Sequence, residues 1–211
     1  MASRPKISRK RRQEILEAAV ETIVERGVCN ARIADVAERT GTSAALVLYY
    51  FESKDRLLTE ALAHAEDGFY LAIFAELTTL ESASERLVRL IELSCGHETM
   101  APMLRDDFAL WIELWSRALR DAAAAKKRAA GDRRWRATIA DIVREGQSAG
   151  EFDAVDVEDF AMHLASLLDG IAVQHVLGDP EADYERARRI CVRMASQSLG
   201  FAVPALVTVE V

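Results

Sequence analysis

The sequence predicts an all-α protein, and three observations support this fold class. Apolar residues recur at three- and four-residue spacing along almost the whole chain, which is the pattern of helices that bury one face. Segments with the alternating pattern of strands are nearly absent. The four prolines and ten glycines fall mostly between the periodic segments, where helices end and begin. Because half of the 211 residues are hydrophobic, the chain can bury a sizeable core without disulfide bonds.

About nine helices are expected. In the first, Ile15, Ala19 and Ile23 share one face, and Gly27 is a natural end. The alanine-rich stretch 121–132 fits either a helix or a mobile connection. The expected helices cover residues 8–26, 33–39, 43–50, 53–77, 84–95, 103–119, 129–149, 157–177 and 184–199.

The charge is distributed unevenly. The formal net charge is −7, which argues against a general polyanion binder. Residues 1–12 nevertheless contain no acid and include the bases Arg4, Lys6, Arg9, Lys10, Arg11 and Arg12. A flexible basic leader of this kind could reach phosphates or a minor groove, and it could equally be a solubilising tail.

Cysteine usage and hydropathy suggest where the protein resides. Cys29, Cys95 and Cys191 are odd in number and far apart, which does not fit a disulfide framework and suits a reducing compartment. No apolar run approaches the ~18 residues of a membrane span, and no apolar segment follows the N-terminal charges as in a signal peptide. We therefore expect a soluble, cytoplasmic protein with no membrane contact.

Residues 33–50 have the outline of a helix-turn-helix. Two short helices are joined at Gly41, a longer helix precedes them, and Ser43 is a suitable N-cap for the second. A helix of about eight residues is not stable alone in water, so it must be held by its neighbours. The spacing predicts that Val47, Tyr50 and Phe51 pack against Ile15, Ala19, Ile33 and Val36, and that Ala44, Ala45, Leu48 and Tyr49 face outward.

The outward face could contact a DNA duplex. Small residues allow close approach to base edges, and Ala or Leu can contact a thymine methyl group. The hydroxyls of Thr42, Ser43 and Tyr49, and the Lys54 ammonium at the next helix start, can bind phosphates. Composition alone also fits a short helix that is simply buried in a core.

Five short patterns occur together in this region: I-A-x-x-A at 33–37, G-x-S at 41–43, Tyr50-Phe51, Ser53-Lys54 and Leu57-Leu58. With this spacing, residues 9–62 resemble the N-terminal domain of the TetR family of transcriptional regulators. The chain departs from the family at Leu48, where Tyr is usual, and at Thr42, where Val is commoner. The resemblance and the basic leader together imply a DNA-binding set of Arg9, Arg11, Thr42, Ser43, Ala44, Ala45, Leu48, Tyr49 and Lys54.

The last two helices are candidates for a dimer interface. A protein that binds a two-fold operator gains affinity and register from its own two-fold symmetry. Both helices carry apolar stripes, which would form a four-helix bundle in a dimer or pack inside one subunit. In the TetR family the corresponding helices form the dimer, and LLDGIAVQ (167–174) followed by GDP resembles one subgroup of its regulatory domains. The expected interface comprises Phe160, Leu164, Leu168, Ile171, His175, Ile190 and Met194.

Aromatic residues gather in the middle of the chain. They fit core packing, and they also fit an apolar effector cavity with a few polar groups, which the resemblance implies beside the long helix 53–77. Tryptophan next to a carboxylate, such as Glu113 or Asp107, would suit a cation. The candidate ligand-binding residues are Phe69, Phe74, Met103, Phe108, Trp111, Trp115, His163 and Asp169.

These patterns predict a DNA-binding domain over residues 1–54, with the basic leader, and an effector-binding and dimerisation domain over residues 55–211. The resemblance implies a homodimeric repressor that a small-molecule effector releases from a pseudo-palindromic double-stranded DNA operator. A helical adaptor that binds other proteins is the alternative, but it leaves the leader and the spacing through Lys54 unexplained. The four histidines form no metal-binding motif and no nucleotide or hydrolase motif occurs, so we expect no enzyme activity, cofactor or metal.

Overall fold

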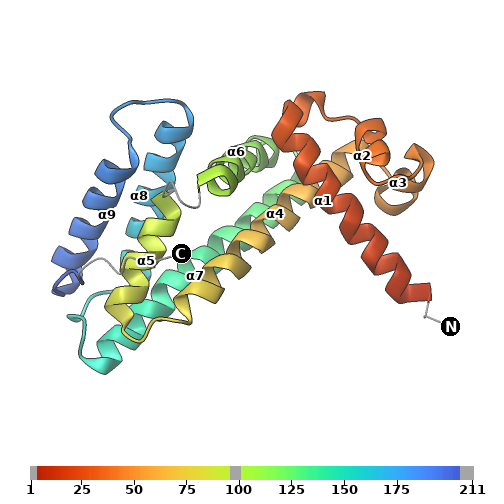
Figure 1. Ribbon diagram of the computed structural model, residues 1–211. Helices are drawn as coiled ribbons and strands as arrows, with labels where there is room; N and C mark the ends of the chain where they lie inside the picture. Colours follow the sequence, from red (N-terminus) through yellow and green to blue (C-terminus); the bar gives the residue numbers. More distant parts are fainter. Residues whose placement is uncertain (1–3, 96–100, 205–211) are drawn as a thin grey trace. The chain divides into compact units, whose positions relative to one another are not determined.

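The structure is a computed structural model that describes the backbone of residues 4–95 and 101–204, and the side chains of residues 9–95, 108 and 110–204. Within these ranges the chain is helical without strands, which confirms the predicted fold class (Figure 1). The described helices are α1 (Arg4–Asn30), α2 (Ile33–Arg39), α3 (Ala44–Phe51), α4 (Lys54–Leu77), α5 (Ala83–Cys95), α6 (Ala101–Ala118), α7 (Ala122–Ala149), α8 (Val157–Val176) and α9 (Tyr184–Leu199). None of them is long and apolar enough to cross a membrane.

The chain divides into two compact units. The first unit is Met1–Phe69 with Ala109–Arg128, and the second is Tyr70–Phe108 with Ala129–Val211. Three long helices, α4, α6 and α7, contribute residues to both units. The units therefore do not coincide with a division of the chain at residue 54.

The first unit has a core built around α1, α2 and α3. Ile15, Ala19, Val36, Val47 and Phe51 are buried together, with Tyr50 and Ile33 partly buried beside them, as the spacing predicts. Further members come from α4 and from the end of α6: Leu57, Leu58, Ala61, Leu62, Leu110 and Leu114. The short α2 and α3 are thus held by longer helices, which supplies the stability that they lack alone.

Three places show how the helix boundaries compare with the expectation. The basic leader was expected to be a flexible arm, but residues from Arg4 onward are the first turns of α1. The regular helical geometry of α1 ends at Gly27, as expected, because its φ of 73° and ψ of 156° are not helical; only residues 28–30 of α1 follow this kink. α7 begins at Ala122, so the alanine-rich stretch is helical, as the high helix propensity of alanine favours.

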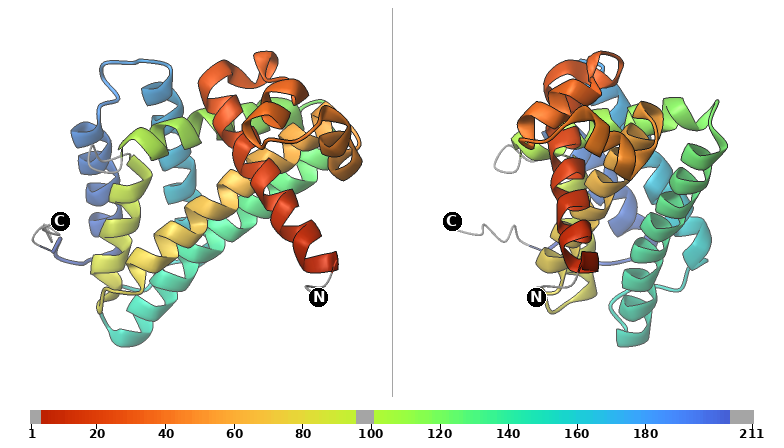
Figure 2. Two further views of the ribbon diagram at one scale, coloured as in Figure 1. Left: turned by 45° about the vertical axis from the view of Figure 1, so that its right-hand side comes forward. Right: turned by 90° about the vertical axis from the view of Figure 1, so that its right-hand side faces the viewer.

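The second unit is built around α5, α8 and α9, which pack against one another (Figures 1 and 2). Leu87, Leu90 and Ile91 of α5 and Leu164 of α8 are essentially inaccessible to solvent. α9 contributes Cys191, Val192, Ala195 and Leu199 to the same core. The end of α4 runs beside α7, where the Tyr70 hydroxyl donates a hydrogen bond of 3.1 Å to the Gly131 carbonyl.

Candidate functional site

Local hydrogen bonds fix the position of α3. Gly41 takes a positive φ of 61°, which allows the sharp turn after α2, and the Thr42 amide donates to the Ala37 carbonyl at 2.8 Å. The Ser43 hydroxyl accepts a hydrogen bond of 3.2 Å from the Leu46 amide, which is the predicted N-cap. With Val47 and Phe51 fully buried, one face of α3 is anchored and the other is presented to solvent.

The presented face of α3 is the one expected. Ala44 and Ala45 are exposed, Leu48 is 40% exposed and Tyr49 is 79% exposed. Tyr50 is half-buried and meets Tyr49 edge to face, with 5.6 Å between the ring centroids. This contact packs the Tyr49 ring against Tyr50, while most of the Tyr49 surface stays exposed to solvent.

The cations around this face have different environments. Arg9 is exposed, and Arg11, also exposed, pairs with Glu14 on the same helix at 2.8 Å. The Lys54 ammonium donates to the Cys29 carbonyl at 3.3 Å, so this side chain connects the start of α4 to the end of α1. Ser53 caps α4 by accepting a hydrogen bond of 3.2 Å from the Arg56 amide.

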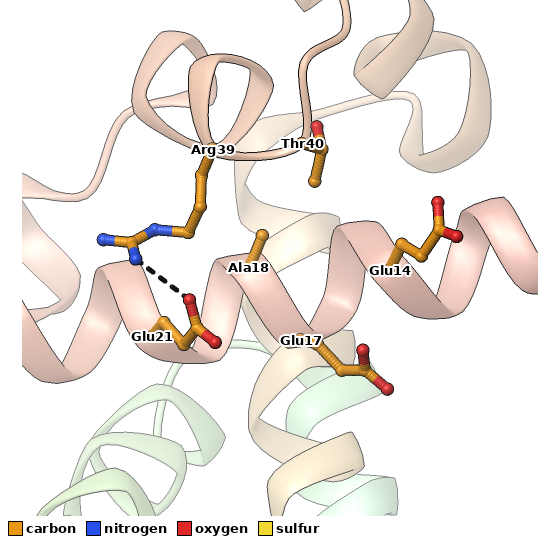
Figure 3. Close-up of a pocket in the computed structure, with 6 residues that line it drawn as sticks. All are labelled: Glu14, Glu17, Ala18, Glu21, Arg39 and Thr40. Atoms are coloured by element: carbon orange, nitrogen blue, oxygen red, sulfur yellow. Dashed lines mark hydrogen bonds and ion pairs between the residues drawn. The ribbon is translucent and has the colours of Figure 1, made fainter.

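Another side of the first unit is acidic. A shallow pocket between α1 and α2 is lined by Glu14, Glu17, Ala18, Glu21, Arg39 and Thr40 (Figure 3). Arg39 reaches from α2 to Glu21 at 2.9 Å and to Glu25 at 2.5 Å, and the hydrogen bond to Glu25 is the main cause of its raised pKa. Because excess carboxylates repel phosphates, this side is unsuited to DNA, whereas the face of α3 carries no acid.

The structure brings some of the candidate ligand-binding residues together. In the first unit Phe69 is buried and meets Trp111 edge to face, with 4.6 Å between the centroids. The Arg128 guanidinium lies 5.3 Å from the centroid of the Trp115 ring. One face of the Trp115 ring is therefore already covered by a cation.

The other candidates have varied environments. In the second unit Phe108 is buried and Asp169 is half-buried, while Phe74 and His163 are exposed. The side chain of Met103 lies outside the described residues, as does that of Asp107. Helical periodicity could not predict that Phe74 and His163 are exposed, because both residues lie on helices with broad apolar faces.

Sequence reasoning missed an aromatic cluster in the second unit. The Arg134 guanidinium lies 3.7 Å from the centroid of the Tyr70 ring, and Trp135 meets the same ring edge to face at 6.2 Å. Tyr70 follows Phe69 directly, so the two rings leave α4 in different directions and serve different units. The signal in the sequence was Trp135 itself, which stands apart from the other two tryptophans.

The candidate dimer residues fall into two groups. Phe160, Leu164 and Leu168 are buried within the single chain. Ile190 is 40% exposed, and Ile171, His175 and Met194 are half-buried; the His175 ring nitrogen Nδ1 also lies 2.9 Å from the Ala182 carbonyl. Met162, which was not a candidate, is half exposed on α8.

Two parts of the chain match profiles of known protein domains. Residues 15–61 match the profile of bacterial regulatory proteins of the tetR family, and residues 83–200 match that of the C-terminal domain of BetI-type transcriptional repressors. The HTH-type transcriptional regulator BetI of Cronobacter sakazakii is 26% identical over 194 residues, which cover 92% of this chain and 93% of the relative.

Solved structures of transcriptional regulators have a similar fold. A transcriptional regulator from Saccharomonospora viridis, crystallised in complex with choline, is 33% identical with a TM-score of 0.79, over 89% of this chain and 96% of the other. A TetR-family regulator from Rhodococcus sp. is 27% identical with a TM-score of 0.76, over 90% and 98%. The profile matches together span the helix-turn-helix and the helices that follow it. The chain therefore belongs to the TetR family of DNA-binding transcriptional regulators, with a C-terminal domain of the BetI type.

Proposed function

We propose that this regulator is a repressor that binds a pseudo-palindromic operator as a homodimer and leaves it when a small cation binds. The observation that carries the DNA-binding part is the exposed face of α3, held by a buried opposite face and free of acidic side chains. We assign DNA binding to residues 1–54 and effector binding and dimerisation to residues 55–211. The phosphate contacts in this proposal come from Arg9, Arg11, Tyr49 and Lys54.

The dimer that we propose uses the solvent-facing side of α8 and α9. Leu168 is buried inside the chain, so in this proposal it packs beneath the interface residues and does not contact the partner subunit. Met162 on α8 and Ile190 on α9 are the exposed apolar residues of these helices, with Ile171 and Met194 half-exposed beside them. Light scattering should therefore give a dimer mass that Ile190→Glu reduces to a monomer mass, while Arg189→Glu, at an exposed neighbouring position, leaves the dimer intact.

The effector that we propose is a quaternary ammonium compound of the choline class. Two observations support it: a 33% identical regulator crystallised with choline, and the aromatic rings of Phe69 and Trp111, which meet edge to face. Aromatic faces attract cations through the ring quadrupole, and quaternary ammonium groups are recognised in this way. Release would follow a population shift, in which the ligand binds more tightly to a conformation with a tilted α4. In that conformation the DNA-binding domains of the two subunits would no longer match the spacing of successive major grooves.

The DNA-binding part is tested with the purified protein and a duplex from upstream of its own gene. We expect nanomolar-range binding that weakens steeply as salt rises, because phosphate contacts release counterions. Lys54→Ala should weaken binding to all sequences by a similar factor and reduce the salt slope, whereas Ala45→Asp should abolish binding. Absence of salt-sensitive binding to that duplex would argue against the repressor and favour a protein-binding adaptor.

The effector part is tested by titrating choline into the protein and into its complex with DNA. We expect tryptophan fluorescence to change and DNA to be released, with Trp111→Ala weakening both effects. The matched control is 3,3-dimethyl-1-butanol, which has the shape of choline without its charge. Equal responses to the two compounds, or none to choline, would show that a quaternary ammonium is not the effector.

A further inference from the structure

We propose that α3 recognises its operator through the methyl groups of thymines, with Leu48, Ala44 and Ala45 as the contacting side chains. This inference rests on the proposed DNA-binding function and specifies which chemical group on the DNA is read. The inference follows from the composition of the exposed face of α3, from the ion pairs of arginines in the same unit, and from the shape of the surface formed by Ala44, Ala45 and Leu48.

The first step concerns what α3 lacks. The helix has the sequence AALVLYYF, so it contains no Arg, Lys, Asn, Gln, Asp or Glu. Those side chains make the hydrogen bonds that distinguish guanine, adenine and cytosine in the major groove. A face without them cannot read base edges through paired hydrogen bonds, however closely it approaches.

The second step concerns the polar groups at the ends of the helix. The Ser43 hydroxyl accepts the capping bond from the Leu46 amide, and Thr42 is half-buried in the turn. The Tyr49 hydroxyl is at the end of a long, exposed side chain, which suits a phosphate on the groove edge. These hydroxyls position the helix, and a single hydroxyl accepts or donates without distinguishing one base from another.

The third step concerns three arginines of the first unit, Arg26, Arg39 and Arg56, whose guanidinium groups pair with carboxylates. Arg26 pairs with Asp35 at 3.0 Å, and Arg56 pairs with Glu52 at 2.6 Å and Glu60 at 3.1 Å. Arg39 is held between Glu21 and Glu25. Exposed ion pairs are individually weak, but each of these guanidinium groups would have to leave a carboxylate before it read a base.

The fourth step concerns what the face offers. Ala44 and Ala45 precede Leu48 by four and three residues, so the three side chains are neighbours on one side of the helix. The two alanines allow the helix axis to come close to the bases, and the branched Leu48 projects beyond them with 40% of its surface exposed. Apolar contact with the C5-methyl group of thymine is the base-specific interaction that such a strip can make.

The experiment replaces thymine with deoxyuridine, which removes the methyl group and leaves base pairing unchanged. The probes are duplexes containing the footprinted operator, with all thymines of both half-sites replaced, and a control duplex with the same replacement only in the flanks. We expect about fourfold weaker binding for each contacted methyl group and about fifteen-fold for a symmetry-related pair, from the transfer free energy of one methylene-sized group. The flank control should bind like the original operator.

Leu48→Ala provides the second measurement, since this exposed substitution should leave the fold intact. The variant should bind the thymine operator more weakly and show a smaller thymine-to-uracil difference than the original protein. Equal binding of the thymine and uracil operators by the original protein would overturn the inference and leave the proposed function standing. Failure to bind the thymine operator at all would instead remove the proposed function itself.

Discussion

The guanidinium of Arg12 lies 4.8 Å from the centroid of the Phe51 ring, and so joins α1 to the end of α3. The same guanidinium forms an ion pair with Glu60 on α4. One side chain of α1 thus contacts both α3 and α4. Arg12 therefore connects different helices of the first unit, whereas Arg11 pairs with Glu14 of its own helix.

Arg12→Ala should therefore destabilise the first unit and weaken DNA binding together. The variant loses a cation–π contact and an ion pair that is partly shielded from water, which together contribute on the order of 1–2 kcal/mol. The melting temperature of the protein, followed by circular dichroism, should fall by several degrees, and DNA affinity should fall because α3 is less firmly held.

Arg9→Ala is the matched control on the same helix. It should leave the melting temperature unchanged and reduce both the affinity and the salt slope of DNA binding, as loss of one phosphate contact does. If Arg12→Ala behaved in the same way, with no change in melting temperature, its role would be contact with DNA rather than positioning of α3.

A second prediction concerns Lys127, which is half-buried on α7. Burial is the main cause that lowers its pKa from 10.5, and repulsion from Arg12 lowers it further. A lysine whose folded-state pKa is lowered releases protons on folding between that pKa and 10.5, so the stability of the protein rises with pH across this window. Below the window the charged lysine is a constant cost to the folded state.

Lys127→Met should accordingly raise the melting temperature at pH 7, because it removes the buried charge and keeps an apolar side chain of similar length. The gain should shrink in a thermal melt as the pH rises to 10.5 and above, because the original lysine becomes neutral first in the folded state and then in the unfolded state. Lys126→Met, at the exposed neighbouring position, should change neither measurement. A lower melting temperature for Lys127→Met at pH 7 would mean that attraction to nearby carboxylates exceeds the cost of burial.

The sequence predicted the first unit in considerable detail because its signals are local. Helical periodicity, a capping serine and a turn glycine specify α2 and α3, and the burial of Val47 and Phe51 follows from spacing. The extension of α1 to Arg4 was missed, and that of α7 to Ala122 was left open, because clustered charges and repeated alanines carry no apolar period. Such segments become helical through the intrinsic helix propensity of their residues and through packing against the rest of the protein.

The helices that follow α3 were harder to predict, since an apolar stripe in the sequence does not indicate which other helix covers it. Leu164 and Ile190 both belong to apolar stripes, yet one is buried inside the chain and the other is 40% exposed. Their difference depends on where α5 packs against α8 and α9, which is a tertiary property. The cations on the faces of Trp115 and Tyr70 likewise come from residues distant in sequence.

A third prediction concerns Glu151, which caps α5 from the loop after α7. Its two carboxylate oxygens accept hydrogen bonds of 3.0 Å from the amides of Ala83 and Ser84. Burial alone would raise the pKa of Glu151, but these hydrogen bonds lower it below 4.5. A lowered carboxyl pKa contributes stability that is present above the unfolded pKa and is lost as pH falls through the folded one.

Glu151→Gln should lower the free energy of unfolding at pH 7 by about 1 kcal/mol, the usual effect of weakening an N-terminal cap. Urea denaturation at pH 7 and at about pH 3.5 would show this, since protonation of Glu151 should reduce the difference between the two proteins at the lower pH. Glu145→Gln, which removes an exposed partner of Arg86, should have a much smaller effect at both values. A pH-independent difference for Glu151→Gln would mean that its charge is unimportant to the cap.

A fourth prediction separates the three cysteines by reactivity. Cys29 is exposed, Cys191 is buried, and the hydrogen bond that Cys95 shares with Cys191, together with burial, raises the pKa of the Cys95 thiol. Because the thiolate is the reactive form, a raised pKa and poor access both slow attack on a disulfide reagent. Ellman's reagent should therefore modify one thiol per native chain quickly and the other two only after unfolding in guanidinium chloride. Cys29→Ser should abolish the fast phase, and a second fast thiol in the native protein would show that the contact between α5 and α9 opens readily.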